Sequence, residues 1–380
     1  MKPLTVRLRT LTPLWTGGAD GRCDRVHETG IIGSLRWWYE AIVRGLGEKA
    51  CDPTARTESK CQDAQHCVAC ELFGCTGWGR RFRLQLDTGR LAYPQRDRRD
   101  VQRFKPPGRK TGWYYGAGQL ASEDEGIDGQ LIVLRDAQYN VANEALTAMQ
   151  LAADWGGVGA RTQHGYGVVE LSAMQDGRLI RADPVAFLAH HPVGDLYGDS
   201  LPALTDFFFA RFQLVVNAPD QWWTRTDANQ RPLLGAHVTT LERWSGGEFE
   251  SVSIAPAVKS QLRYGSNAFA HKWGNERSIF GHIGRQRRKA RINISGAYQD
   301  GGRWTFRVWG WLPREQSNLD RAAFLNDLHV VLSSHAFWRD VFGAPLLVDL
   351  TSIVWREFDS PRDTIAHTTN AGVFLTSLLA

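Results

Sequence analysis

The chain lacks a long apolar run, an export signal and the common nucleotide-binding loop. No stretch of its 380 residues approaches the length needed to cross a membrane. The first nine residues alternate apolar and charged side chains, as a strand does, and contain no signal-peptide core. The Gly-Lys-Ser/Thr triplet of a P-loop is also absent. These absences predict a cytoplasmic protein with no membrane partner.

The chain also lacks a strong excess of one charge. Its 45 Lys and Arg against 40 Asp and Glu give a formal net charge of +5, which is small for a protein that binds nucleic acid. The basic residues nevertheless gather in clusters at 80–83, 96–109 and 285–291. The 15 Trp include adjacent pairs at 37–38 and 222–223, which suit stacking on bases, although core packing is their commoner use. A hydrophobic share of 43% indicates a globular chain, and its length favours two domains.

Glycine, by contrast, is concentrated in the segment 156–167. A helix is expected before it, at 143–154, and a strand after it, at 168–171. A dinucleotide-binding loop has the opposite order, from strand to helix. The segment is therefore predicted to bring exposed amides and an arginine close to a polyanion or a packed partner. Its glycines are Gly156, Gly157, Gly159, Gly165 and Gly167.

Five of the six cysteines lie between residues 51 and 75. Such a local cluster in a cytosolic chain favours a metal site over disulfides, and Cys67 and Cys70 have the usual knuckle spacing for zinc. Cys51 and Cys61 are the expected second pair, although His66 or Cys75 is close enough to replace one of them. Four protein ligands would make the zinc structural. The alternative is that the cysteines are small buried side chains and bind no metal.

A short pattern occurs twice in the chain. Ser34-Leu35-Arg36 is followed by Leu72-Phe73-Gly74 and a basic strand, and Ser260-Gln261-Leu262-Arg263 is followed by Ile279-Phe280-Gly281 and another basic strand. The repeated order favours two related domains, although short motifs also recur by chance.

The expected elements fit this division. Further strands are expected at 4–11, 207–216 and 304–311, and helices at 33–44 and 321–341. The first half then follows a β-α-β-β-α-β outline, which is the ferredoxin-like arrangement. The predicted fold class is α+β, with two tandem ferredoxin-like, RNA-recognition-like domains. The first covers residues 1–185, with a Cys-rich insertion at about 50–71 and a basic insertion at about 94–116, and the second covers 205–380.

Four motifs together resemble the RAMP superfamily of CRISPR-associated proteins. They are Thr12-Pro-Leu-Trp-Thr-Gly-Gly18, Gly30-Ile-Ile-Gly-Ser-Leu-Arg-Trp-Trp38, Cys67-Val-Ala-Cys-Glu-Leu-Phe-Gly-Cys-Thr-Gly77 and the glycine segment 156–167. Within the superfamily, the Trp-Thr-Gly-Gly start and the Leu-Arg-Trp-Trp helix resemble the family of first subunits of the type III-B Cmr effector complex.

The resemblance implies a non-catalytic RNA-binding subunit of a type III-B CRISPR ribonucleoprotein. Such a subunit lies near the crRNA 3′ end, beside other RAMP subunits, and helps to engage target RNA in antiviral defence. Its expected partners are crRNA, target RNA and those subunits, with no small-molecule substrate. RNA is held by basic groups on phosphates and by flat side chains on bases. The residues expected to contact it are Arg36, Arg80, Arg81, Arg83, Arg161, Thr162, His164, Arg263 and Arg291.

Two other functions remain open from the sequence. Some RAMP relatives cleave RNA without metal, so His27 and His164 could form an acid/base pair, and Asp20 or Asp24 could act from a loop. The chain has no His-Asp doublet, no Gly-Gly-Asp-Asp signature and no paired carboxylate cluster, which argues against a metal-dependent nuclease or cyclase. The third function is a protein scaffold without direct RNA contact.

Overall fold

A computed structural model describes residues 3–17, 23, 25–54, 61, 66–87, 126–195, 201–216, 251–252, 254–281, 289–313, 319–343 and 348–380. The backbone of two further strands is described, β3 (Gln102–Phe104) and β4 (Trp113–Tyr115), which pair antiparallel with each other. The rest of the expected basic insertion lies outside the described residues. Asp20, Asp24 and the Trp pair at 222–223 lie outside them too.

The first half of the chain forms an antiparallel sheet with the strand order β2-β5-β1-β6-β7. Apolar residues alternate with polar ones along β1, so that one face of the strand is buried and the other faces outward. The strands are β1 (Leu4–Thr10), β2 (Phe82–Leu86), β5 (Ile127–Val133), β6 (Val169–Gln175) and β7 (Arg178–Ile180). The strands expected at 4–11 and 168–171 are confirmed as β1 and β6.

Two long helices cover the buried face of this sheet. They are α1 (Glu28–Gly45) and α3 (Val141–Trp155), and they confirm the helices expected at 33–44 and 143–154. The side chain of Asn140 caps α3 by accepting a hydrogen bond from the amide of Asn143. Two short helices, α2 (Val68–Phe73) and α4 (Pro184–His190), complete this half. The principal elements therefore run β1-α1-β2-β5-α3-β6 along the chain.

The second half forms another antiparallel sheet, with the order β13-β8-β12-β11-β9 and with β10 also paired to β12. The strand expected at 207–216 is confirmed, and the one expected at 304–311 begins one residue earlier. The strands are β8 (Phe207–Val216), β9 (Ser251–Val252), β10 (Ile292–Ile294), β11 (Ala297–Asp300), β12 (Arg303–Trp311) and β13 (Val348–Glu357). The two sheets share one spatial order of strands. In the first sheet the order of the principal strands is β6-β1-β5-β2, and in the second it is β13-β8-β12-β11, so each sheet has its last principal strand beside its first.

The helices of the second half differ from the prediction in one place. The single helix expected at 321–341 is wrong, because the chain forms α8 (Arg321–Leu332) and then α9 (His335–Phe342). Ser334 has an extended backbone and begins the new helix, so the two serines at 333–334 interrupt the helical run. The remaining helices are α5 (Ala255–Tyr264), α6 (Ala268–Trp273), α7 (Arg277–Phe280) and α10 (Ala371–Leu379). In the described part of the chain, no helix is both long and apolar enough to cross a membrane.

The repeated sequence pattern adopts the same local structure in both halves. Gly74 follows α2 with φ 87° and ψ 159°, and Gly281 follows α7 with φ 78° and ψ 164°. The residue that precedes the next strand then donates its amide to the aliphatic residue of the pattern. Arg81 donates to the Leu72 carbonyl at 3.0 Å, and Arg291 donates to the Ile279 carbonyl at 2.7 Å. The pattern is therefore a structural repeat and not a chance match.

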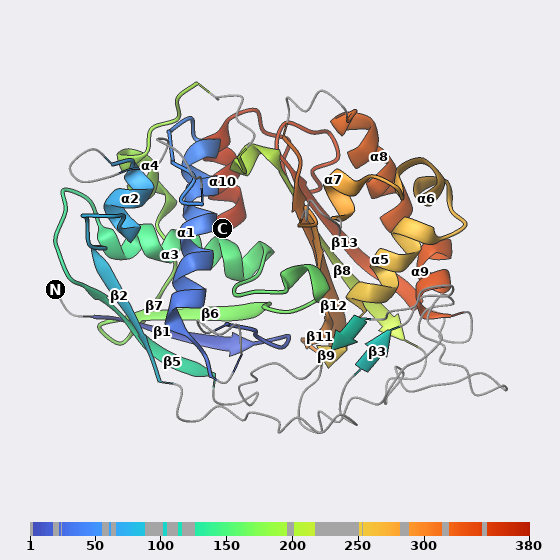
Figure 1. Cartoon of the computed structure of the whole chain (residues 1–380), viewed down its shortest axis with the longest axis horizontal. Helices are drawn as coiled ribbons and strands as arrows, with labels where there is room; N and C mark the ends of the chain where they lie inside the picture. The colour runs from blue at the N-terminus through green and yellow to red at the C-terminus, as the bar shows by residue number, and fades with distance from the viewer. Residues whose placement is uncertain are drawn as a thin grey trace.

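The second sheet is covered on both faces. Along β8, Phe207 and Phe209 belong to the core of the first half, whereas Phe208 and Ala210 belong to the core of the second. Figure 1 shows α1, α3 and α10 on one side of this sheet and α5, α8 and α9 on the other. The apolar side chains of α10 pack in the first core, so the C-terminal helix returns to the N-terminal half.

Candidate nucleic-acid interface and metal centre

The glycines of the segment 156–167 are required by close packing. A Cβ at Gly156 would lie 2.1 Å from the Trp38 ring. Gly159 has φ +79°, and a Cβ there would lie 2.5 Å from the Trp15 carbonyl oxygen. Gly167 has φ +85°, and its Cβ would lie 2.1 Å from the Val158 carbonyl oxygen. Side chains at these positions would therefore clash with α1, with the segment after β1 and with the loop itself.

Several amides of this loop are already bonded within the protein. The amide of Val158 donates to Gly167 at 2.8 Å, that of Gly159 to the Ser34 hydroxyl at 2.8 Å, and that of Ala160 to Trp15 at 2.7 Å. The expectation that the glycine segment exposes these amides to a polyanion is wrong, because they anchor the loop to α1 and to the segment after β1. A ligand would therefore meet the side chains of the loop.

A cleft of about 930 Å³ lies between the two halves, which we call the inter-half cleft. The first half lines it with the N-terminal part of α1 and the glycine segment, and the second half with the residues around β10 and the end of β12. The basic and aromatic side chains in its wall are Trp37, Trp38, Arg161, Lys289, Arg291, Trp309 and Trp311. Among the described residues, the lining residues include no Asp or Glu. The cleft therefore offers positive charge beside flat aromatic surfaces.

Two arginines of the cleft lie over tryptophan rings. Arg161 has a left-handed backbone with φ 63°, and its guanidinium lies 3.6 Å from the ring centroid of Trp15. Arg291 lies 4.5 Å from the ring centroid of Trp311. Cation–π contacts of this kind hold a guanidinium plane in place against the ring. Thr162 bonds across the cleft, because its hydroxyl donates to the Asn293 side chain at 2.9 Å.

His164 belongs to the short helix η2 (Thr162–His164) and is partly buried. Burial, together with the nearby charges of Lys259 and Arg161, lowers its pKa to about 4. The imidazole is therefore neutral at pH 7 and lacks the second proton that an imidazolium general acid transfers. His27 begins α1, where its amide donates to the Thr16 hydroxyl at 2.9 Å.

Arg36 points away from the inter-half cleft, toward the cysteines. Its guanidinium donates to Glu40 at 2.8 Å, to the Gly74 carbonyl at 2.6 Å and to the Cys70 sulfur at 3.1 Å. RNA binding by Arg36 stays a prediction, and its observed contacts join α1 to the turn after α2.

The other predicted RNA-binding arginines lie at separate places. Arg81 pairs with Glu71, and Arg263 donates to the Gly274 carbonyl at 3.2 Å. Arg80 is partly exposed just before β2, and Arg83 is exposed on its outer face. The structure thus gathers Arg161, Thr162 and Arg291 at the inter-half cleft. Trp311 and Asn293 were not among the predicted site residues. The alternation of apolar and polar residues predicts a strand, but it does not show which end of the strand faces the other half of the chain.

The outer face of the first sheet has a different character. Arg7 bonds Asp128 at 2.6 Å and Arg9 bonds Glu170 at 2.6 Å across neighbouring strands. Its other described outward residues include Thr5, Gln85 and Gln130, and none of the described side chains lining its central hollow is aromatic. RNA-recognition domains stack bases on aromatic side chains of the sheet face. This face offers no such platform in the described residues, which favours the inter-half cleft.

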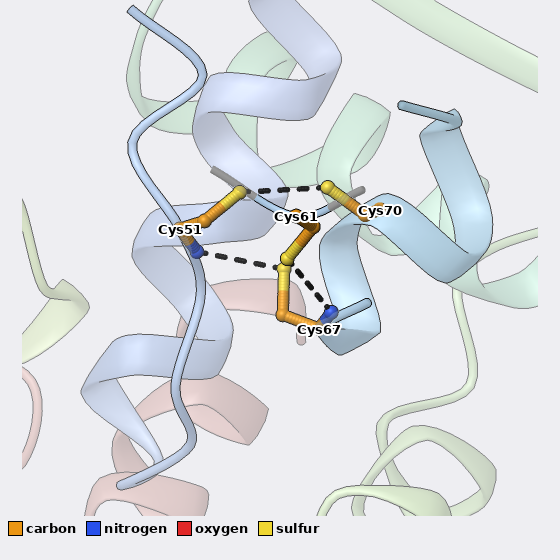
Figure 2. Close-up of side chains that lie close together, drawn as sticks. All are labelled: Cys51, Cys61, Cys67 and Cys70. Carbon is orange, nitrogen blue, oxygen red and sulfur yellow. Dashed lines mark hydrogen bonds between the residues drawn. The ribbon is translucent and has the colours of Figure 1, made fainter. Parts of the chain in front are cut away.

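The cysteine cluster is assembled by three segments of the first half. Among the described residues, the sulfurs of Cys51, Cys61, Cys67 and Cys70 all lie within 4.8 Å of one another. Figure 2 shows the four side chains converging beside α1. The Cys51 and Cys70 sulfurs are 3.4 Å apart, close to the value of about 3.8 Å between thiolates on a tetrahedral zinc. The cluster can therefore hold a metal ion.

The two alternative ligands lie outside this set of sulfurs. His66 contacts Glu71, and its ring stacks on Trp78 with centroids 4.5 Å apart. Cys75 forms an isolated bridge with Trp78. Within the set, a hydrogen bond from Cys70 lowers the pKa of Cys67 to about 4, whereas burial raises the pKa of Cys61 to about 11. Cys67 is thus the first to become the thiolate that binds metals.

Comparison with known proteins finds a family model that resembles part of the chain. The profile of the RAMP superfamily matches residues 7–170. Residues 7–170 are therefore similar to the RAMP superfamily, and we call them the RAMP region. The predicted resemblance is confirmed, and the matched RAMP region contains the first sheet from within β1 to the start of β6, the cysteine cluster and the glycine segment. Among curated protein sequences, no match was found.

The solved structures that align with this chain have low sequence identity to it. Cmr1 from Pyrococcus furiosus, in its apo form, is 14% identical, with a TM-score of 0.43 over 92% of this chain and 98% of that one. A chain of the type III-B Cmr-beta complex bound to cognate target RNA and AMPPnP is 11% identical, with a TM-score of 0.40 over 86% of this chain and 99% of that one.

Proposed function

We propose that this protein is a non-catalytic RNA-binding subunit of a type III-B CRISPR effector complex. It would lie near the crRNA 3′ end, contact crRNA or target RNA, and adjoin other RAMP subunits in the cytoplasm. The RAMP region and the motifs that resemble Cmr first subunits support the proposal that the complex is a type III-B effector. The inter-half cleft, which combines basic and aromatic side chains, supports RNA as the ligand.

The proposal includes two tandem ferredoxin-like domains, at 1–185 and 205–380. The equivalent strand order in the two sheets supports it, as does the repeated turn at Gly74 and Gly281. In such a pair, the glycine segment of the first domain lies against the second, so the cleft depends on both. Single-stranded RNA would then be held between domains instead of on an open sheet.

RNA binding can be tested with a double variant, Arg161→Ala with Arg291→Ala. Both side chains line the cleft, and each phosphate contact is worth about 1–2 kcal/mol, so affinity for a single-stranded oligoribonucleotide should fall by about 30-fold to 1000-fold. The slope of log affinity against log salt should fall by about two. Filter binding across a salt series measures both.

The matched control is Arg178→Ala with Arg303→Ala, which removes the same charge from exposed positions outside the cleft. Equal affinity of the two double variants would refute the cleft as the binding site. Wild-type protein without RNA affinity at any salt concentration would instead favour a protein scaffold. Loss of target cleavage by the assembled complex after His27→Ala with His164→Ala would favour the ribonuclease alternative.

We also propose that Cys51, Cys61, Cys67 and Cys70 hold a structural zinc ion. Their sulfurs are positioned for four ligands, and Arg36 donates to Cys70, which offsets the negative charge of a tetrathiolate site. Elemental analysis should find one zinc per chain, and chelation should lower the melting temperature. Cys67→Ser with Cys70→Ser should abolish binding, whereas Cys23→Ser should not. Metal-free protein with an unchanged melting temperature would disprove the site.

A further inference from the structure

Four basic side chains gather where η2 packs against α5. Arg161 precedes η2 and His164 ends it, while Lys259 and Arg263 lie one turn apart on α5. The packing of η2 on α5 and on β10 brings the glycine segment of the first half to this helix of the second. Arg161 also lines the inter-half cleft, so the cluster adjoins that cleft.

Lys259 is the most unusual member of this cluster. Its side chain is in a residue only 7% exposed, yet among the described residues its ammonium has no hydrogen bond and no ion pair. Two other buried cations have carboxylate partners, and buried Arg307 donates to a carbonyl and a hydroxyl. Arg44 lies 3.5 Å from Glu40, and Arg356 lies 3.0 Å from Asp363. The ammonium nitrogen is not one of the fully buried unpaired atoms of the described residues, so it reaches the surface, where an anionic ligand could contact it. An ammonium that is mostly shielded from water and has no acceptor favours such a ligand.

The charges that act on Lys259 and His164 are also positive. Burial and the charge of Arg263 together lower the pKa of Lys259 to about 8. His164 is in turn affected by Lys259 and Arg161. Arg263 perturbs Lys259, and Lys259 and Arg161 perturb His164, so positive charges lie close to one another in this cluster.

The repeated pattern allows Arg263 of the second half to be compared with Arg36 of the first half. In the repeated pattern Arg263 corresponds to Arg36, and Arg36 is neutralised by Glu40, four residues further along its helix. The residue four positions after Arg263 is Asn267, whose neutral side chain caps α6 and donates to the Gln261 carbonyl. The first half therefore supplies a carboxylate to its arginine within α1, whereas α5 ends at Tyr264 and Arg263 has no such carboxylate one turn further along its helix.

We propose that Lys259, with Arg263 and His164, binds a phosphate group of the RNA that occupies the inter-half cleft. The ammonium and guanidinium donate to the phosphate oxygens, and the neutral imidazole donates through its N–H. The proposal rests on the proposed RNA-binding function, and it adds a phosphate position on α5 to the side chains that line the cleft. Because free phosphate has the same chemistry, the experiment separates the two sources.

The test compares Lys259→Met with Lys272→Met in the full-length chain. Methionine keeps most of the side-chain volume and removes the charge, and Lys272 is an exposed lysine of the same half, paired with Asp327. The first measurement is the melting temperature against inorganic phosphate at constant ionic strength. The second is the affinity for a single-stranded oligoribonucleotide across a salt series.

Without phosphate, Lys259→Met should be at least as stable as wild type, because it removes an unpaired buried charge. Phosphate should raise the melting temperature of wild type and Lys272→Met more than that of Lys259→Met. Lys259→Met should weaken RNA binding by about tenfold and reduce the salt slope by about one, whereas Lys272→Met should change neither.

Two results would overturn the proposal. The first is an RNA affinity and salt slope of Lys259→Met equal to those of Lys272→Met, even when Arg161→Ala with Arg291→Ala weakens binding. That result would leave the RNA-binding cleft intact and remove only the phosphate position. The second is a phosphate response lost in Lys259→Met without any RNA effect, which would assign the site to free phosphate.

Discussion

A single buried histidine links three segments of the first half. His191 is fully buried, and its Nδ1 lies 2.6 Å from Glu48 while its Nε2 lies 2.9 Å from Glu144 and 3.0 Å from the Tyr39 hydroxyl. Burial alone would lower its pKa, but hydrogen bonds to the two glutamates outweigh burial and raise the pKa to about 9. The folded protein therefore holds a histidinium between two carboxylates, which joins α1, α3 and the end of α4.

This network predicts a pH-dependent stability. The pKa of His191 is about 9 in the folded state, above its unfolded value of about 6.5, so its contribution is complete below pH 6.5 and is lost as the pH rises to 9. The free energy of unfolding should fall by about 2 kcal/mol across this window. Urea unfolding at a series of pH values measures the loss.

A control variant shows whether the pH dependence of stability comes from His191 or from other titrating groups. His191→Gln should flatten the stability profile between pH 6.5 and 9, whereas His367→Gln, at an exposed histidine beside Asp359, should keep the wild-type profile. The same slope in all three proteins would show that His191 does not carry the proton.

At the scale of elements, local sequence patterns placed the main strands and helices well. The alternation at 4–11 and the apolar run at 207–216 predicted β1 and β8, because a strand with one or two buried faces leaves a clear pattern. The run at 321–341 was misread as one helix, because its apolar spacing continues through Ser333 and Ser334. A serine can either continue a helix or cap its end, and the sequence alone does not show which of the two the tertiary packing favours.

The glycine segment shows what a pattern of residue types leaves undecided. Its position between α3 and β6 was predictable, but its close approach to Trp15 and Trp38 was not. Glycines that admit a ligand and glycines that admit a neighbouring element look the same in a sequence. The same holds for Arg36, whose partners Glu40 and Cys70 are chosen by how α2 packs on α1.

At the scale of the whole molecule, the end of α3 joins the two halves. Arg307 on β12 donates to the Ala153 carbonyl, and Arg211 on β8 donates to the Asp154 carbonyl at 2.7 Å. The last carbonyls of a helix carry partial negative charge and lack partners within the helix, so guanidinium groups are favourable there. Trp155 follows, and its indole N–H donates to Leu378 of α10 at 2.7 Å.

These contacts fix the second sheet against the helices of the RAMP region, and the inter-half cleft depends on that arrangement. Arg307 is a residue only 6% exposed, and it also donates to the Tyr298 hydroxyl at 2.9 Å. Arg307→Met should therefore lower the free energy of unfolding by about 2–4 kcal/mol, because it leaves buried acceptors without their donor. RNA affinity should fall as well, although Arg307 does not line the cleft.

Arg303→Met is the matched control for this prediction, because Arg303 lies exposed on the same strand and, among the described residues, its side chain bonds only the Gln213 amide oxygen, at 3.2 Å. Its effect on stability should stay within about 0.5 kcal/mol. Urea unfolding followed by tryptophan fluorescence, together with filter binding, compares the two variants. Equal stability would show that the halves are held together by their apolar surfaces alone. Lower stability of Arg307→Met with unchanged RNA affinity would show that the cleft tolerates a shift between the halves.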